Sequence, residues 1–108
     1  MAKYKLVVMS KPVEGREADY NNWYQNVHLR DIVKCGFKAA QRFRLAEDVA
    51  NTKPFPYMAI YEAEVDDPKV LLQKLMQGSS NGEIAMSDSL DPDLYVGMYQ
   101  DFGARVGS

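Results

Sequence analysis

Four segments of the chain have patterns typical of β-strands: in 37–46 the apolar and polar positions alternate with a two-residue period, and the others are rich in β-branched and aromatic residues. The four segments are residues 3–10, 37–46, 57–65 and 94–102. The third has the clearest pattern, because aromatic and β-branched residues recur along it. We therefore predict four strands, separated by segments with a different period.

The segment 16–28 has the three-and-four spacing of an amphipathic helix. The apolar positions at this spacing are Tyr20, Trp23, Tyr24 and Val27. At Leu29 the pattern restarts with a different phase, and Gly36 follows as a residue that commonly ends helices. We expect two short helices, or one helix that is kinked near His28.

A second helix is expected after the third strand. Asp67 is a favourable N-cap, Pro68 fits the first helical turn, and we place the end of the helix at Gly78. The segments 48–56 and 79–92 are rich in residues that favour turns, such as Pro, Asn, Gly, Ser and Asp. We predict that both are loops.

The predicted elements follow the order β-α-β-β-α-β. This is the order of the ferredoxin-like fold in the α+β class, in which the helices cover one face of a four-stranded antiparallel sheet. A chain of 108 residues has the usual size of one domain. We therefore predict a single domain over residues 1–108.

Large apolar side chains occur on both parities of the first, third and fourth strands. One predicted set is Val7, Met9, Met58, Ile60, Val96 and Met98, and the other is Leu6, Val8, Tyr57, Tyr61, Tyr95 and Tyr99. Two helices can cover only one of these faces, and burying each exposed side chain would contribute about 1.5–3 kcal/mol. We predict a two-fold homodimer that packs sheet against sheet.

Composition narrows the classes of function. Hydrophobic residues make up 46% of the chain, so the protein should fold. The net charge is −2, so the chain has no positive electrostatic field that would attract nucleic acid. A single Cys and a single His supply neither a disulfide nor an imidazole cluster. The apolar run 6–9 is too short to cross a membrane, and no leader pattern precedes it. We expect a soluble, cytoplasmic protein without a membrane partner.

One motif runs from Tyr20 to Phe43 and reads Y-x-x-W-Y-x-x-x-H-x-x-D-I-x-x-x-G-F-x-A-x-x-R-F. Together with the order of elements it resembles the dimeric α/β-barrel superfamily, particularly its EthD-like branch. The resemblance implies a homodimer whose sheets face each other, with a small-molecule cleft between sheet and helices in each subunit. The superfamily includes cofactor-independent monooxygenases, haem-degrading enzymes, lactone isomerases and polyketide cyclases, so the resemblance implies a pocket and not one reaction.

His28 is the candidate catalytic residue, because only His has an ordinary pKa near neutrality. At 100° per residue it lies at the edge of the aromatic helix face, so it either faces the cleft or forms a hydrogen bond at the helix break. In similar family members, a His at this position often faces the cleft. A neutral imidazole there could take a proton from a phenol or an activated carbon and return it elsewhere.

The predicted substrate-binding residues are all aromatic: Tyr20, Trp23, Tyr24, Tyr61 and Tyr99. Three of them, Tyr24, Tyr61 and Tyr99, could donate hydrogen bonds to a developing oxyanion if their hydroxyls converge. The alternative for these tyrosines is packing in the core or in an interface. The single Trp is more typical of a core anchor than of a surface that stacks on substrate.

Several other polar residues have two interpretations. Asp31 could orient His28 or be an exposed acid in a helical turn. Arg42 and Arg44 share a strand face with Lys38, which suggests either an anion site or a solvated edge or dimer salt bridge. Cys35 is expected to fill space in the core, since no second imidazole is available to activate it.

The sequence indicates no cofactor and no metal. It has no G-x-G-x-x-G fingerprint, and the aspartates between residues 88 and 93 lack calcium-loop spacing. His28 lies in the first-helix motif, whereas similar haem enzymes carry their ligand on a late helix.

Two functions remain open. One is a cofactor-independent isomerase, cyclase or monooxygenase that acts on a small aromatic or cyclic metabolite with His28 as acid/base. The other is a non-catalytic binding or stress-associated dimer in which His28 is structural.

Overall fold

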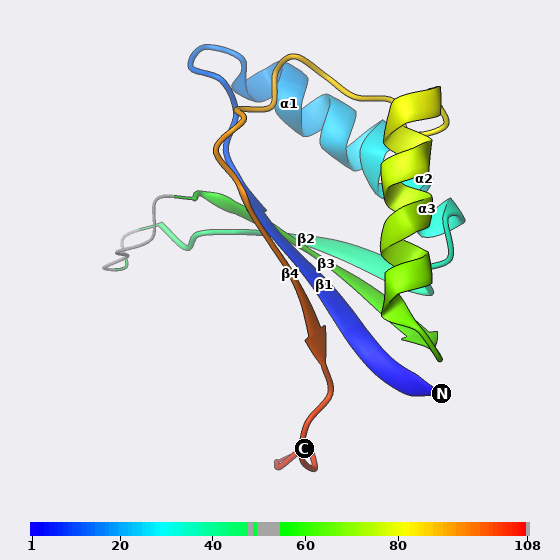
Figure 1. The fold of residues 1–108 in the computed structure, drawn as a ribbon. Coiled ribbons are helices and arrows are strands. Elements are labelled where there is room, and N and C mark those ends of the chain that lie inside the picture. The colour runs from blue at the N-terminus through cyan, green and yellow to red at the C-terminus, as the bar shows by residue number, and fades with distance from the viewer. Residues whose placement is uncertain (48, 50–54, 108) are drawn as a thin grey trace.

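The computed structural model describes residues 1–47, 49 and 55–107, so most of the predicted loop 48–56 lies outside the described residues. The elements are β1 (Ala2–Ser10), α1 (Glu17–Trp23), the π-helical turn η1 (Tyr24–His28), α2 (Leu29–Lys34), β2 (Ala39–Arg44), β3 (Tyr57–Val65), α3 (Pro68–Asn81) and β4 (Tyr95–Gln100) (Figure 1). The predicted order of strands and helices is confirmed, although the second and fourth strands are shorter than expected.

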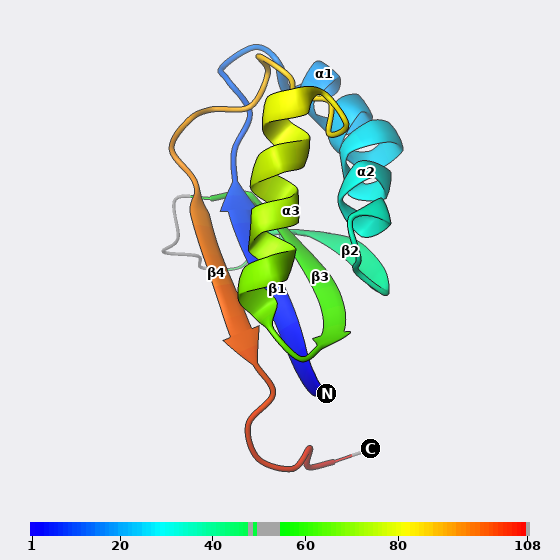
Figure 2. The same cartoon turned by 45° about the vertical axis from the view of Figure 1, so that its right-hand side comes forward.

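The four strands form one antiparallel sheet in the order β2-β3-β1-β4. The helices lie on one face of this sheet, and within residues 1–47, 49 and 55–107 none lies on the other (Figure 2). This arrangement is the predicted α+β, ferredoxin-like fold. Within the described part of the chain, no helix has the length and the apolar character needed to cross a membrane.

The first helix is continuous and contains a π-turn where a break was expected. Residues Tyr24, His28 and Leu29 all keep right-handed helical dihedrals, and the N–H of Leu29 donates to the carbonyl of Tyr24, five residues back. The extra residue rotates the following turn by about 100°, which explains the change of phase in the sequence. It also turns Val27 outward, so that this residue is 38% exposed and not part of the buried face.

Helix α3 begins as predicted, with Asp67 as N-cap and Pro68 in the first turn. The prediction that it ends at Gly78 is wrong, because the helix continues to Gly82, which forms a left-handed C-cap with a φ of 88°. Gly78 is a packing position. A Cβ there would lie 2.8 Å from Cδ1 of the buried Ile84, which is closer than two carbon atoms can approach.

The core lies between the helices and the inner face of the sheet and is rich in aromatic rings. Its buried apolar residues are Leu6, Tyr20, Trp23, Tyr24, Leu29, Ile32, Phe37, Tyr57, Ala59, Tyr61, Ala63, Leu71 and Ile84. Strand β4 contributes none of them. The helices therefore cover β3 more completely than they cover β4.

The two faces of β4 are reversed relative to the predicted sets. The pairing with β1 places Val96 and Met98 on the same side as the buried Leu6, facing the helices. Tyr95 and Tyr99 consequently lie on the outer face. The sequence alternation shows which residues of a strand share a face, but the pairing register decides which face is inside.

The outer face of the sheet carries an apolar patch that no part of the described chain covers. We call this the outer patch; it consists of Val7, Met9, Phe43, Met58, Ile60, Tyr95 and Tyr99, all of which are half-buried or exposed. Lys5 and Glu62 pair across β1 and β3 next to it, so the patch is bordered by charge at one end.

Candidate functional site

The π-turn η1 brings the His28 ring onto aromatic side chains of the preceding turn. In a π-turn, residues five apart lie one above the other, whereas in an α-helix they are about 140° apart. The imidazole stacks on Trp23, with ring centroids 4.4 Å apart and an interplanar angle of 29°. It also meets Tyr24 edge-on at 4.9 Å. The projection at 100° per residue missed these contacts because it assumed an α-helix throughout.

His28 is neutral at physiological pH. Burial lowers its pKa to about 4, because apolar surroundings disfavour the imidazolium, and the negative charge of Asp31 offsets only part of this shift. Its Nδ1 is enclosed and has no hydrogen-bond partner among the described residues. His28 therefore makes no capping bond, and its unsatisfied nitrogen costs about 1–3 kcal/mol. A ligand atom that formed a hydrogen bond with this nitrogen would recover that cost.

Tyr24 and Tyr61 form a buried hydroxyl pair beside the imidazole. Tyr61 donates a hydrogen bond to the Tyr24 hydroxyl at 3.1 Å. Burial raises the pKa of Tyr24 to about 12 and also raises the pKa of Tyr61, so both phenols stay protonated at neutral pH. Since Tyr61 is the donor, the hydrogen of the Tyr24 hydroxyl has no acceptor among the described residues.

The other two tyrosines of the predicted set lie elsewhere. Tyr20 is 0% exposed, and its hydroxyl is hydrogen-bonded to Ser10 at 2.6 Å, so its place is in the core. Tyr99 lies in the outer patch, where its hydroxyl is hydrogen-bonded to Tyr95 across Gly97. The expected convergence of three hydroxyls is therefore reduced to the pair on η1 and β3.

Trp23 and Asp31 hold the loop after α3 against the first helix. The indole N–H of Trp23 donates to the carbonyl of Ala85 at 2.8 Å, and the amide of Ala85 donates to Asp31 Oδ2 at 3.0 Å. Asp31 makes no hydrogen bond to His28, so of the two interpretations the structure does not support the one in which it orients the imidazole; its carboxylate positions the loop. Trp23 is a core anchor that also forms one wall of the His28 environment.

Arg42, for which the sequence left open an anion site, a solvated edge or a dimer salt bridge, lies among the aromatic rings of the core. Its guanidinium lies over the rings of Tyr20, Tyr24 and Tyr57, at 5.6, 4.9 and 5.3 Å from their centroids. The side chain faces the helices because residue 42 pairs with the buried Ala59. The sequence contained one indication of this position. Arg42 is two residues from Ala40 and therefore shares its face of the strand, and Ala40 packs against the core.

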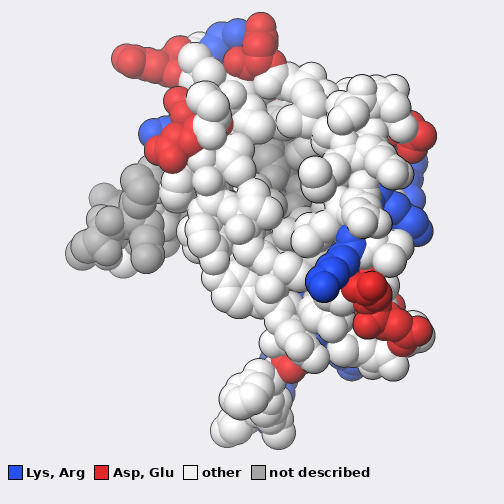
Figure 3. Space-filling model, viewed as in Figure 1, with Lys and Arg blue, Asp and Glu red and all other residues white. Residues whose placement is uncertain are grey.

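A hollow opens between the helices and the β1–β4 side of the sheet. Figure 3 shows it near the middle of the molecule, with uncharged atoms around it. The incomplete cover of this part of the inner face explains it, since Val8 and Met98 are only partly buried and Val96 is 52% exposed. The hollow is thus suited to an apolar molecule.

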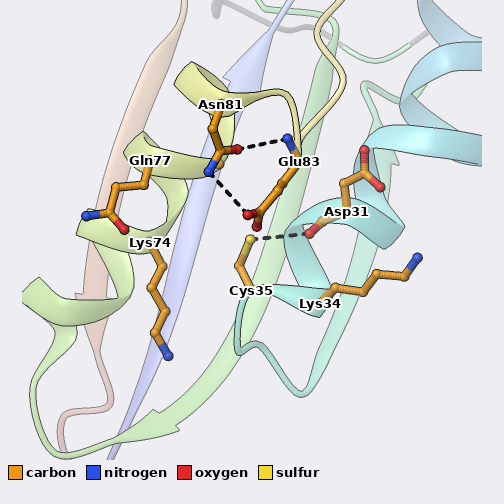
Figure 4. A pocket seen from close by; sticks show the side chains of 8 residues that line it. Asp31, Lys34, Cys35, Lys74, Gln77, Asn81 and Glu83 are labelled. Atoms are coloured by element: carbon orange, nitrogen blue, oxygen red, sulfur yellow. Dashed lines mark hydrogen bonds between the residues drawn. The ribbon is translucent and has the colours of Figure 1, made fainter.

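A second cavity, of about 470 Å³, lies between α2 and α3 and is polar (Figure 4). Cys35 and Glu83 point toward each other in it, whereas the side chain of Lys34 points away. Burial, together with the carboxylates of Glu83 and Asp31, raises the pKa of the Cys35 thiol. The thiol is therefore not activated as a nucleophile. No group of three or more potential metal-ligating side chains occurs among the described residues.

Two crystal structures are similar to this chain in fold. A protein of the ethyl tert-butyl ether D (EthD) family from Bacillus halodurans C-125 matches with a TM-score of 0.62 and 20% identity, over 94% of this chain and 100% of its own. An EthD-like protein from Ralstonia eutropha JMP134 matches with a TM-score of 0.58 and 17% identity, over 90% and 91%. This chain has an EthD-like fold. The resemblance found in the sequence motif is confirmed at the level of the fold.

No protein-family model and no curated protein matches the chain. An EthD-like fold at such low identity establishes how the chain is folded, but not which reaction it supports. The chemistry that this chain can support is therefore inferred from the side chains around His28.

The low pKa of His28 predicts a pH-dependent loss of stability. Between its ordinary pKa of 6.5 and about 4, the unfolded chain binds a proton at His28 that the folded chain excludes. The free energy of unfolding should therefore decrease as pH falls through this window, by up to roughly 3 kcal/mol. His28→Gln should lack this part of the pH dependence in urea unfolding curves measured from pH 7 to pH 4. Equal slopes for the two proteins would contradict the buried, neutral imidazole.

Proposed function

We propose that the protein is a cytoplasmic homodimer that binds a small aromatic or cyclic metabolite in the hollow and transfers a proton on it through His28. The observation that carries this proposal is the enclosed, unpartnered Nδ1 of a neutral imidazole that is stacked on Trp23. Buried polar atoms in native proteins nearly always have a partner, and exceptions concentrate at functional sites.

The proposed chemistry uses two groups of the chain. The imidazole of His28 accepts a proton from a hydroxyl or an activated carbon of the ligand and returns it at another atom, so that no electrons are gained or lost. The Tyr24 hydroxyl donates a hydrogen bond to the oxyanion that develops, and Tyr61 holds this hydroxyl in place. Isomerisation and cyclisation need only these steps. Monooxygenation would in addition need dioxygen as a co-substrate, and we favour it less.

The apolar character of the site supports a largely uncharged ligand. The aromatic rings of Trp23 and Tyr24 enclose the imidazole, so the surroundings of His28 are apolar. A charged ligand would lose its hydration in the hollow without an opposite charge nearby.

Dimerisation through the outer patch is the second part of the proposal. The patch is continuous across all four strands, and exposed apolar areas of this kind usually mark an interface. A two-fold arrangement lets the same patch cover itself, which needs no other partner.

A non-catalytic role has one observation in its favour. Tyr20, Tyr24 and Tyr61 are almost completely buried, as expected of residues that only complete a core. In that case the protein would bind a ligand without turnover, and His28 would serve packing alone. The two functions can be distinguished by removing the imidazole of His28. The catalytic function predicts weaker ligand binding and loss of turnover, whereas the non-catalytic function predicts unchanged binding and no turnover in either protein.

We expect phenolic or lactone compounds to raise the melting temperature of the protein, because a ligand that binds only the folded state stabilises it. Binding of a stabilising compound can be followed by the fluorescence of Trp23, the single Trp of the chain. His28→Gln should weaken this binding about tenfold or more, corresponding to the loss of one good hydrogen bond, and should abolish turnover.

Gln25→Ala is the matched control, since Gln25 lies in η1 but is exposed. It should leave both binding and turnover unchanged. If His28→Gln binds every stabilising compound as tightly as the unchanged protein and none is turned over by either, the non-catalytic role is correct.

The dimer should have twice the chain mass of 12.2 kDa in light scattering at micromolar concentration. Ile60→Glu places a charge at the centre of the outer patch and should shift the mass to that of the monomer without loss of secondary structure. Gln73→Glu adds the same charge on the exposed side of α3 and should leave the dimer intact. A monomeric mass for the unchanged protein would refute this part of the proposal.

A further inference from the structure

Two arginines on β2 lie side by side without an acidic partner. Arg42 and Arg44 both face the helix side of the sheet, because they pair with the inward-facing Ala59 and Tyr57. The ion pairs found among residues 1–47, 49 and 55–107 involve neither of these arginines. Two neighbouring like charges repel each other, so the arrangement favours an anion between them.

Arg42 is held in a fixed orientation. Its Nη2 donates to Asn21 Oδ1 at 2.6 Å and its Nη1 donates to the Asn21 carbonyl at 3.5 Å. Three tyrosine rings surround the guanidinium plane. Two of the five N–H groups donate to Asn21, and the guanidinium also interacts with the Tyr20 hydroxyl, so at most two N–H groups remain for a ligand. A donor group that is already fixed loses little conformational entropy when it binds a ligand.

A surface cavity of about 350 Å³ lies next to both arginines. Its lining residues are Asn21, Arg42, Phe43, Arg44 and Tyr57. Arg44 is exposed, has no hydrogen-bond partner among the described residues and can therefore move toward a bound group. The Tyr57 ring supplies apolar surface at the same place, whereas the Phe43 side chain lies on the opposite face of the sheet, in the outer patch.

The nearest acidic group does not neutralise this cavity. Glu17 accepts a hydrogen bond from the Tyr57 hydroxyl at 2.5 Å, and the Asn21 amide donates to the same hydroxyl at 3.1 Å. The Glu17 carboxylate is thus engaged by the phenol, and it is not one of the lining residues. One carboxylate beside two guanidinium groups leaves the cavity with net positive charge.

We propose that Arg42 and Arg44 form a binding site for a small oxyanion, the carboxylate or phosphate group of a metabolite. Planar guanidinium groups bind these groups through paired hydrogen bonds, and two of them can share one anion. The site lies on β2, and its Arg42 contacts the rings of Tyr20 and Tyr24. It does not depend on the function proposed above.

The test measures the melting temperature and the apparent dissociation constant with inorganic phosphate and with acetate, each against chloride at equal ionic strength. We expect saturable stabilisation by phosphate or acetate in the unchanged protein. Arg44→Gln should weaken binding about tenfold, as expected when a charge-assisted hydrogen bond is lost, and Arg44→Lys should weaken it less, since it keeps the charge but not the paired donors.

Lys38→Gln is the matched control, because it removes the same charge near the start of β2 but outside the cavity. It should leave binding within about twofold of the unchanged protein, and so should His28→Gln. Stabilisation no greater than with chloride, or equal losses in Arg44→Gln and Lys38→Gln, would overturn the proposal. Dissociation of the dimer by Arg44→Gln without any anion binding would show instead that the arginines contact a second copy of the chain.

Discussion

The extra residue in the π-turn η1 constrains both the core and the site. It allows the aromatic face before Tyr24 and the aliphatic face after His28 to pack against the same sheet, although their sequence phases differ. The same rotation stacks the imidazole on Trp23. A regular α-helix would place these two rings about 140° apart and would turn either α1 or α2 away from the core.

This geometry leaves one buried polar atom, the Nδ1 of His28, without a hydrogen bond among the described residues, which costs free energy of folding. Most polar groups of the inner face are satisfied, as Ser10 pairs with Tyr20 and Tyr61 with Tyr24. The Nδ1 of His28 is the exception among the buried side-chain atoms of the described residues. Stacking on Trp23 and the edge-on contact with Tyr24 offset part of that cost, and burial keeps the imidazole neutral.

The sequence predicts the fold well because the two-residue and three-to-four-residue periods depend on local geometry. It predicts the helix end at Gly78 wrongly, since the need for space beside Ile84 arises only from tertiary packing. It also misses the place of Arg42 over three tyrosines, which depends on the register between β2 and β3. The candidate residue His28 was identified, and the change of phase at Leu29 predicted a break or a kink near it. The contacts of its ring depend on the π-turn, which the change of phase alone does not specify.

The pKa of His28 is the most direct test of this account. The chain has one His, so its imidazole resonances can be followed by NMR from pH 8 to pH 3 without ambiguity. The buried, stacked ring predicts a midpoint of about 4. A midpoint near 6.5, the ordinary value, would mean that the ring is in water and that η1 does not form the site described.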